Sequence, residues 1–292
     1  MNGVLVLDKP AGMSSAMAVD QVKKRLGAKR AGHGGTLDPI ATGVLAICLD
    51  EATKLAAYLL ADDKEYEAEL VLGSETDTLD RTGAVVATHD ASKVTREAIE
   101  SALLARMGEH DQMPPMYSAI KVGGTRLYHR ARNGEEVERA VRRVRFDRLD
   151  LIGFASATES SPPRVRIAIA CSKGTYVRSL IADLGTDLGC GAHMSELRRT
   201  RCGVFKLAQA HDLDRLDGFT LVPMEASTRL PRVVAAAELV TKVRNGLQMP
   251  PDVLGVRPED YDRFQLLDSA GQIVAVGHVE ANKVLYDRVF VS

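Results

Sequence analysis

A glycine-rich loop that ends in an aspartate constrains this chain more than any other stretch. Residues 32–45 read GHGGTLDPIATGVL, and the apolar run from Val44 predicts a buried strand directly after the loop. Pro39 disfavours helical backbone at Asp38, so this carboxylate is expected on stiff, extended chain. The glycines would let the loop bend tightly or let a ligand approach its backbone. An Asp-Pro turn that only caps the strand would have the same local sequence.

The length and composition of the chain predict a globular protein of one large domain or two. It has 292 residues, of which 45% are hydrophobic and 26% charged, and a net charge of -1. Basic residues nevertheless cluster in residues 21–37, 126–148 and 198–206. Such clusters on a neutral chain suit the phosphate backbone of a nucleic acid, although solvated helix faces would explain each cluster equally well.

Cysteine usage and hydropathy bear on cofactors and compartment. The four cysteines form no CxxC pair, and Cys190, His193 and Cys202 lack a fourth partner at zinc spacing. No glycine-rich nucleotide fingerprint follows a strand, so we expect neither a metal nor another cofactor. No signal peptide precedes the first strand and no apolar run approaches the length of a membrane span, which predicts a cytoplasmic protein.

Hydrophobic periodicity predicts strands and helices along the whole chain. We expect strands over residues 3–7, 64–72, 144–152, 164–171, 272–279 and 284–291. We expect helices over residues 14–27, 51–62, 95–107 and 175–188, with Gly108 ending the third and Thr175 capping the fourth. Arg178 would then lie in a first helical turn, where the helix dipole disfavours a cation unless an anion faces it.

Six sequence blocks occur in the order found in the TruB-type tRNA pseudouridine synthases, which the chain resembles over residues 3–207. They are GVLVLDKPAGMSS, GHGGTLDPIATGVL, KEYEAELVLGSETDTLD, PPMYSAIKVGGTRLYHRARNG, CSKGTYVRSL and ELRRTRCGVF. The resemblance implies an α+β fold whose catalytic domain, residues 1–228, contains a mixed, largely antiparallel sheet. It also implies a small β-rich, PUA-like RNA-binding domain over residues 229–292.

The resemblance implies isomerisation of one uridine to pseudouridine at position 55, in the T-loop of tRNA. In that family the aspartate of the GTLDP block is the nucleophile, which maps onto Asp38. His33 matches a histidine that fills the space left by the extruded base, and Tyr66 matches a tyrosine stacked on that base. A tyrosine on an alternating strand could equally be a core residue. Stacking and a nearby phenol would both suit a base that has been flipped out of the RNA.

The remaining matches surround the same pocket. Tyr176, Arg178 and Leu197 match residues that line it, and Lys54 and Asp80 match polar residues near it. In a dry pocket a carboxylate tends to become protonated, so a fixed guanidinium at Arg178 would keep the catalytic aspartate charged and oriented. A surface ion pair is the plainer interpretation of that arginine.

Several alternatives stay open at the level of sequence. Attack at C1′, addition at C6 and proton removal at C2′ are all compatible with one aspartate. The chain could instead be a protein that binds and folds tRNA, with catalysis secondary. A third possibility is a small-molecule enzyme, such as a glycoside hydrolase, that uses Asp38 and Asp80 as paired carboxylates. We expect the T-arm of tRNA as partner, without a membrane and without an obligate protein partner.

Overall fold

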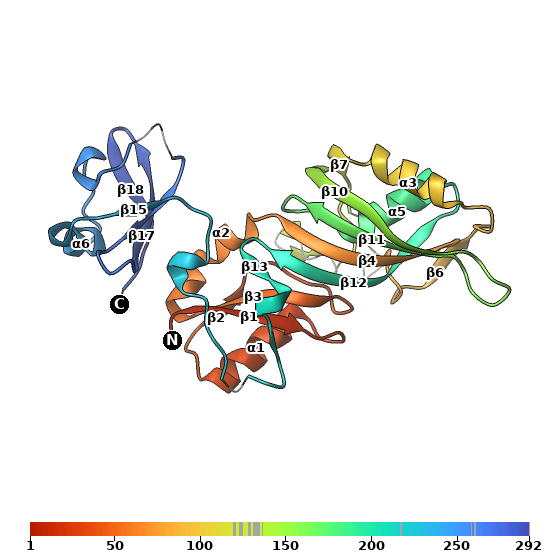
Figure 1. The fold of residues 1–292 in the computed structure, drawn as a ribbon, viewed down its shortest axis with the longest axis horizontal. Coiled ribbons are helices and arrows are strands. Elements are labelled where there is room, and N and C mark those ends of the chain that lie inside the picture. Colours follow the sequence, from red (N-terminus) through yellow and green to blue (C-terminus); the bar gives the residue numbers. More distant parts are fainter. Residues whose placement is uncertain are drawn as a thin grey trace. The chain divides into compact units, whose positions relative to one another are not determined.

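The computed structural model describes residues 1–118, 121–122, 125–127, 130, 135, 137–216, 218–257, 259 and 261–291. The chain divides into two compact units, which are described separately below (Figure 1). Unit 1 comprises Met1–Asp38, Val44–Ala61 and Cys202–Ser292, and unit 2 comprises Pro39–Gly43 and Asp62–Arg201. Much of the fourth sequence block, including Gly123 and Gly124, lies outside the described residues.

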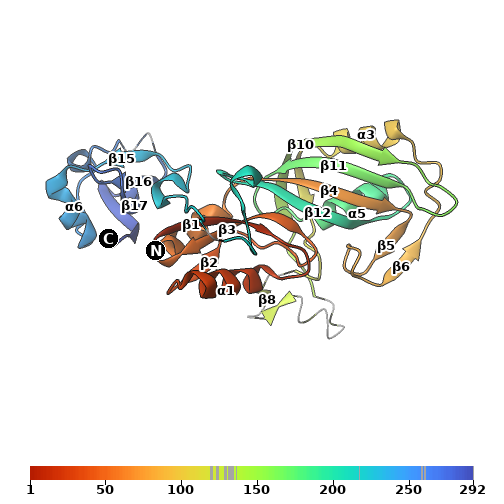
Figure 2. The same ribbon diagram turned by 60° about the horizontal axis from the view of Figure 1, so that its bottom comes forward.

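The first layer of unit 1 is built from N-terminal strands and one helix. They are β1 (Gly3–Lys9), α1 (Ser15–Leu26), β2 (Ala31–His33) and β3 (Thr42–Leu49), joined by β13 (Phe205–Lys206) and β14 (His211–Asp212). β1 lies between β14 and β3, and β2 pairs with β3 in antiparallel fashion. α1 packs against β2, as Figure 2 shows. The apolar run from Val44 is buried throughout, which confirms the predicted strand after the glycine-rich loop.

The segment after β3 differs from the single α-helix expected over residues 51–62. It forms a 3-10 helix, η1 (Asp50–Leu55), followed by a short α-helix, α2 (Ala56–Leu60). Asp50 has a positive φ of 49°, and its carboxylate accepts hydrogen bonds from the backbone N–H groups of Lys29 and Arg30 at 2.8 and 2.9 Å. Because this turn is anchored, the segment begins as a tighter 3-10 helix. Only its second half forms an α-helix.

The C-terminal part of unit 1 is rich in strands, as predicted. A four-stranded sheet has the order β15-β16-β17-β18, formed by β15 (Arg232–Val234), β16 (Phe264–Leu267), β17 (Ile273–Glu280) and β18 (Lys283–Val289). Its apolar core includes α6 (Ala237–Arg244) and η4 (Asp252–Leu254). Two further 3-10 turns, η2 (Leu207–Gln209) and η3 (Met224–Ala226), precede it.

Unit 2 is organised on a sheet with the order β12-β4-β11-β10-β7. Its strands are β4 (Lys64–Leu72), β7 (Gly108–Gln112), β10 (Arg142–Ala155), β11 (Arg164–Cys171) and β12 (Ala192–Cys202). The pairs β4–β11, β11–β10 and β10–β7 are antiparallel, whereas Thr42 and Gly43 pair with β12 in parallel. The described residues of this unit also form two small hairpins: β5 (Ser74–Thr76) with β6 (Val85–Thr88), and β8 (Lys121–Val122) with β9 (Thr125–Arg126). The expected mixed, largely antiparallel α+β fold is confirmed.

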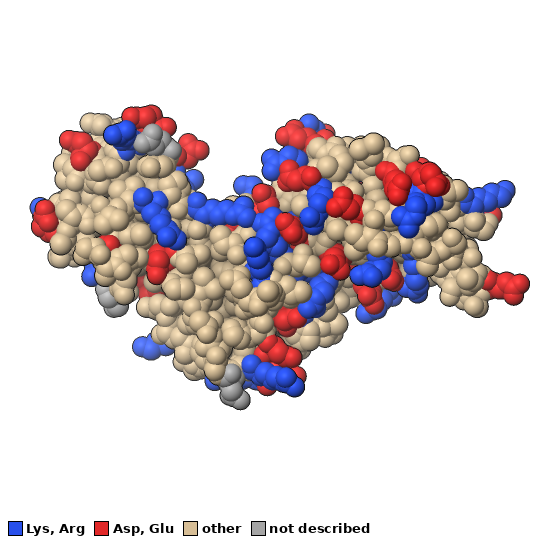
Figure 3. All heavy atoms as spheres, in the orientation of Figure 1, with Lys and Arg blue, Asp and Glu red and all other residues tan. Residues whose placement is uncertain are grey.

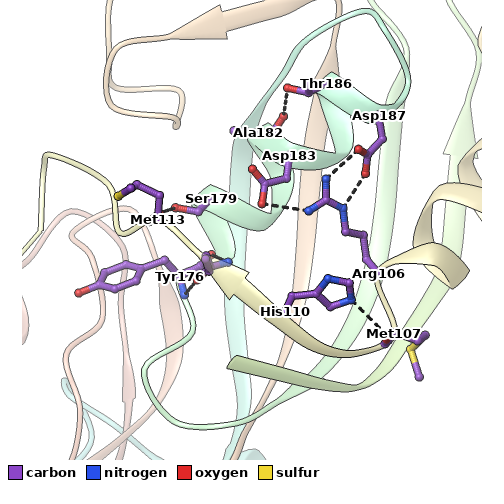
Figure 4. A network of polar contacts seen from close by, with 11 residues as sticks. Arg106, Met107, His110, Met113, Tyr176, Ser179, Ala182, Asp183, Thr186 and Asp187 are labelled. Atoms are coloured by element: carbon purple, nitrogen blue, oxygen red, sulfur yellow. Dashed lines mark hydrogen bonds and ion pairs between the residues drawn. The ribbon is translucent and has the colours of Figure 1, made fainter. Parts of the chain in front are cut away.

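Two helices pack on the sheet of unit 2. α3 (Arg96–Ala105) packs against β10 and α5, and α5 (Val177–Asp187) packs against β4. The expectation that Gly108 ends the helix is wrong, because α3 stops at Ala105 and Gly108, with φ 86°, starts β7. Arg106 is the residue directly after α3. Its guanidinium contacts the carboxylates of Asp187 at 2.6 Å and Asp183 at 3.4 Å (Figure 4). The side chain therefore ties the end of α3 to α5.

The outer face of this sheet carries charges of both signs. Glu65, Glu67 and Glu69 alternate along β4 with buried residues and form ion pairs with arginines of the flanking strands: Arg201, Arg166 and Arg164. Arg143, Arg145 and Arg148 of β10 also lie in ion pairs. Ion pairs join Arg143 to Glu109 and Asp111, Arg145 to Asp147, and Arg148 to Asp150. Figure 3 shows this mixture of basic and acidic side chains. Much of the described part of the predicted basic cluster over residues 126–148 is thus locally neutralised.

Candidate active site

Asp38 lies at the end of the glycine-rich loop and is half-buried. Its neighbour Leu37 is buried, whereas Pro39 is exposed. A Cβ added to Gly34 would lie 2.6 Å from the Cβ of Leu59, so the loop needs a glycine there for close packing against α2. One function of the glycine-rich sequence is therefore close packing of this loop against α2 in the same unit. Asp38 stands at the end of the loop.

The backbone just before Asp38 is fastened to α1. The side-chain hydroxyl of Ser15 accepts a hydrogen bond from the N–H of Leu37 at 2.8 Å and donates one to the C=O of Leu37 at 2.9 Å. Ser15 is 2% exposed. Its neighbour Ser14 is the N-cap of α1 and accepts from the N–H of Met17 at 3.2 Å. Nothing in the local sequence indicates that Ser15 would hold the aspartate loop.

His33 is the last residue of β2 and is half-buried. Its Nδ1 accepts a hydrogen bond from the backbone N–H of Gly35 at 3.4 Å. An accepting Nδ1 in a neutral imidazole places the proton on Nε2. The ring is thereby oriented by the loop that leads to Asp38.

The predicted base-pocket residues Tyr66 and Leu197 both lie in strands of unit 2. Tyr66 belongs to β4 and pairs in register with Ile169 of β11, and Leu197 belongs to β12. Each is 8% exposed. Leu197 is also tied through its C=O, which accepts a 3.5 Å hydrogen bond from the hydroxyl of Thr42.

Arg178 and Asp80 form a buried ion pair in unit 2. Each is 4% exposed, and Nη1 of the arginine lies 3.8 Å from Oδ2 of the aspartate. The guanidinium also donates to the backbone carbonyls of Thr78 at 2.9 Å and Tyr117 at 2.8 Å. An anion therefore does face this cation in the first turn of α5, as the helix dipole requires. The pairing of Arg178 with Asp38 would join the two units and stays a prediction.

The other oxygen of Asp80 is held by three donors. Oδ1 accepts from the hydroxyl of Thr78 at 2.9 Å, and from the N–H and hydroxyl of Thr82 at 2.9 and 2.5 Å. Leu79 beside it has a left-handed backbone, with φ 61°. A carboxylate with three donors on one oxygen and a guanidinium near the other is fixed in orientation.

Tyr176 is held at its backbone by a glutamine from β7. The carboxamide of Gln112, which is 3% exposed, accepts from the N–H of Tyr176 at 2.7 Å and donates to its C=O at 3.1 Å. Ser179 donates to the C=O of Met113 at 2.8 Å, so the start of α5 is fastened to the end of β7 (Figure 4). Gln112 is a residue that sequence reasoning missed. Its only signal is a polar residue directly before the Met-Pro-Pro connector.

The predicted cap of this helix is wrong. Tyr176, not Thr175, is the N-cap residue of α5. Thr175 instead uses its hydroxyl to donate to the C=O of Ser172 at 2.9 Å, which closes the preceding turn. A threonine hydroxyl engaged within a turn cannot reach the free N–H groups of the helix.

Lys54 contacts the C-terminal strands of unit 1. Its ammonium group lies 2.6 Å from a carboxylate oxygen of Glu51 and donates to the C=O of Val289 at 2.8 Å. It also lies 5.6 Å from the ring centroid of Phe290. These contacts give Lys54 a role in holding β18, and its predicted place near the pocket stays a prediction.

All four cysteines are buried and free. Burial raises the pKa of Cys48 to about 12 and that of Cys171 to about 12. Both thiols are therefore protonated at neutral pH and unsuited to act as nucleophiles.

Across residues 1–291, apart from the gaps given above, no three His, Cys, Asp or Glu side chains gather as metal ligands would. In the same part of the chain, no helix combines the length and apolar character needed to cross a bilayer.

Two family models match the chain in succession. The model described as TruB family pseudouridylate synthase (N terminal domain) matches residues 23–177, more than half of the chain. The model described as tRNA pseudouridylate synthase B C-terminal domain matches residues 178–240.

Curated relatives and solved structures agree with these models. The tRNA pseudouridine synthase B of Pseudomonas aeruginosa (strain UCBPP-PA14) is 51% identical over 217 residues, which cover 74% of this chain and 69% of that protein. The protein of the same name from Aromatoleum aromaticum is 48% identical over 300 residues, covering 100% of this chain and 93% of that protein. A chain in the crystal structure of a Cbf5-Nop10-Gar1 complex superposes with a TM-score of 0.75 at 29% identity, covering 99% of this chain and 85% of that one.

Proposed function

The chain belongs to the TruB family of pseudouridylate synthases, and we propose that it isomerises a uridine in the T-loop of tRNA to pseudouridine. The observation that carries the proposal, beside family membership, is the buried pair of Arg178 and Asp80. A buried ion pair is a poor device for stability, because desolvation of the charges opposes their attraction. Retention of this pair despite that cost therefore supports a functional site around Arg178.

The reaction breaks the bond between C1′ and N1, turns the uracil, and joins C1′ to C5, with no net oxidation. In our proposal the Asp38 carboxylate either adds to a carbon of the nucleoside or removes a proton from it, and the base is detached in the course of the reaction. Flipping the uridine out of the loop costs a few kcal/mol, and stacking on an aromatic side chain returns about 1 to 3 kcal/mol. Tyr66 is the stacking residue in this scheme, and His33 occupies the space that the base leaves.

The same proposal assigns roles to the residues around the pocket. Tyr176 and Leu197 line it, and Arg178 keeps the reactive carboxylate charged. Asp80 holds this arginine in place through the ion pair between the two side chains. The ion pair between Asp80 and Arg178 supports this division of labour, because a guanidinium that already has one buried carboxylate is fixed in orientation before substrate binds.

We further propose that residues 1–228 form the catalytic domain and residues 229–292 a PUA-like domain that binds RNA. The four-stranded sheet β15–β18, with its own apolar core, supports the second part of this proposal. An enzyme of this kind acts on the T-arm in the compartment that holds tRNA, which for a bacterial relative is the cytoplasm.

The test is release of tritium from a T-arm hairpin labelled at C5 of its uridine, because the new bond at C5 requires that hydrogen to leave. We expect release with the unaltered protein and none with Asp38→Asn. The variant should bind the hairpin within about threefold of the unaltered protein, since an uncharged isostere hardly changes phosphate contacts. Asp90→Asn, an exposed carboxylate in the segment before α3, is the matched control and should retain full release.

Two results would contradict the proposal. If the unaltered protein bound the hairpin tightly but released no tritium, a protein that binds and folds tRNA would be favoured. Near-normal release by Asp38→Asn would remove Asp38 from the role of nucleophile.

A further inference from the structure

We infer that Ser15 is a positioning residue for Asp38, acting through the backbone of Leu37. The inference rests on the proposed function, because it takes Asp38 as the reacting carboxylate. It is carried by the two hydrogen bonds between the Ser15 hydroxyl and the N–H and C=O of Leu37, at 2.8 and 2.9 Å.

A single hydroxyl can serve both polar groups of one residue because it has one proton to donate and lone pairs to accept with. The two contacts together fix both the position of the Leu37 backbone and its rotation. Ser15 is 2% exposed, so water does not compete for either contact. The peptide that enters Asp38 therefore has a defined orientation before any substrate is bound.

The support on which Ser15 is mounted is itself rigid. Ser15 is the first residue of α1, and Ala18 and Val22 of this helix are fully buried. On the other side of the contact, the Leu37 side chain is 3% exposed. The hydroxyl thus links a packed helix to a packed loop residue, and Asp38 is the next residue along the chain.

Ser14 and Ser15 divide two tasks that the sequence alone does not separate. Ser14 caps α1, whereas Ser15 leaves the cap to its neighbour and turns to the loop. Both carry the same side chain, and they are adjacent. Removal of the Ser14 hydroxyl therefore tests helix capping, and removal of the Ser15 hydroxyl tests the contact with Leu37.

Misplacement of a reacting group by about 1 Å can reduce a rate about 100-fold. We expect Ser15→Ala to lower kcat for tritium release about 10- to 100-fold. KM for the T-arm hairpin should stay within about twofold, because a buried hydroxyl makes no phosphate contact. Ser14→Ala, the matched control, should keep kcat within about twofold, since a helix cap contributes to helix stability alone.

Hydrogen exchange provides a measurement that does not depend on activity. Ser15→Ala should speed exchange of the Leu37 amide about tenfold or more, and leave that of Met17 unchanged. Ser14→Ala should do the reverse. Should Ser15→Ala fail to fold, Ser15→Cys takes its place with the same expectations, because a thiol is a much weaker donor and acceptor.

The outcomes separate this inference from the proposed function. If no variant releases tritium, including the unaltered protein, the proposed function fails, and the exchange data still report on the contact. The inference is overturned if Ser15→Ala turns over like the unaltered, active protein, or if Ser14→Ala and Ser15→Ala lower kcat equally. Unchanged exchange at Leu37 in Ser15→Ala would also overturn it.

Discussion

Replacement of Asp80 by asparagine should destabilise the protein through Arg178. The substitution keeps the shape of the side chain and the oxygen that accepts from Thr78 and Thr82, but it removes the charge 3.8 Å from the guanidinium. Breaking a buried ion pair by removing one partner typically costs 3–5 kcal/mol, since the remaining charge is left without compensation. The carbonyls of Thr78 and Tyr117 still accept from Arg178, so we expect the lower end, about 3 kcal/mol.

The assay is the free energy of unfolding from urea titrations followed by circular dichroism, at neutral pH. Asp77→Asn is the matched control. It lies in the same loop, is exposed, and accepts from the N–H of Ala84 at 2.9 Å, without contact to a buried cation. We expect it to cost less than about 1 kcal/mol. Equal losses for the two variants, within about 0.5 kcal/mol, would show that the charge of Asp80 does not stabilise Arg178.

Three further substitutions test other parts of the structure. Gln112→Met removes both contacts to the backbone of Tyr176 and should lower kcat for tritium release about tenfold; unchanged kcat would mean that β7 does not position Tyr176. The N–H of Arg30, helped by that of Lys29 and the N-terminal ammonium group, lowers the pKa of the Asp50 carboxyl. The ionised Asp50 carboxylate therefore stabilises the fold fully above the ordinary carboxyl pKa. This stabilisation is lost as the pH falls through the lowered pKa that Asp50 has in the folded protein. Asp50→Asn should accordingly reduce the melting temperature at neutral pH but not in strong acid, and a deficit that persists in acid would refute this cause. Lys54→Ala removes the contact to Val289 and should speed hydrogen exchange in β18 but not in β16, whereas equal exchange in both strands would deny Lys54 this role.

Local patterns were sufficient to predict several elements to the residue. β4 and β11 match the expected ranges because charged and apolar residues alternate along strands with one buried face. The start of α1 follows from a serine cap, and its end from Gly27 with φ 64°. The sequence failed at the end of α3, since Gly108, with φ 86°, starts β7 instead of ending the helix. It also failed at η1, where Asp50 has φ 49° and its carboxylate is held by the N–H groups of Lys29 and Arg30.

The site could be predicted only where a residue carries its own signal. Asp38 and Arg178 stand in distinctive sequence blocks, and their roles in the reaction stay predictions. Ser15 and Gln112 have no such signal, because what defines them is a partner 22 or 64 positions away along the chain. The contacts of these ordinary serine and glutamine side chains arise because the fold brings α1 to Leu37 and the end of β7 to Tyr176. Such roles belong to tertiary structure and cannot be seen in local sequence.

Gly43, five residues after Asp38, offers a test of how this region is anchored on its downstream side. It has φ 98°, and a Cβ added there would lie 2.2 Å from the backbone oxygen of Arg199, with which it pairs. Gly43→Ala therefore meets both an unfavourable backbone conformation and a clash with main chain that cannot move aside as a side chain could. We expect a loss of about 3 kcal/mol or more in the free energy of unfolding.

Gly32→Ala is the control for this change, because a Cβ at Gly32 of β2 meets nothing within 4 Å. It should change stability by no more than about 0.5 kcal/mol. If Gly43→Ala were equally harmless, the chain after Asp38 could shift without strain, and the parallel pairing of Thr42 and Gly43 with β12 would not anchor it. A large loss confined to Gly43 would mean that the aspartate lies between two fixed points, the Ser15 contact before it and the β12 pairing after it.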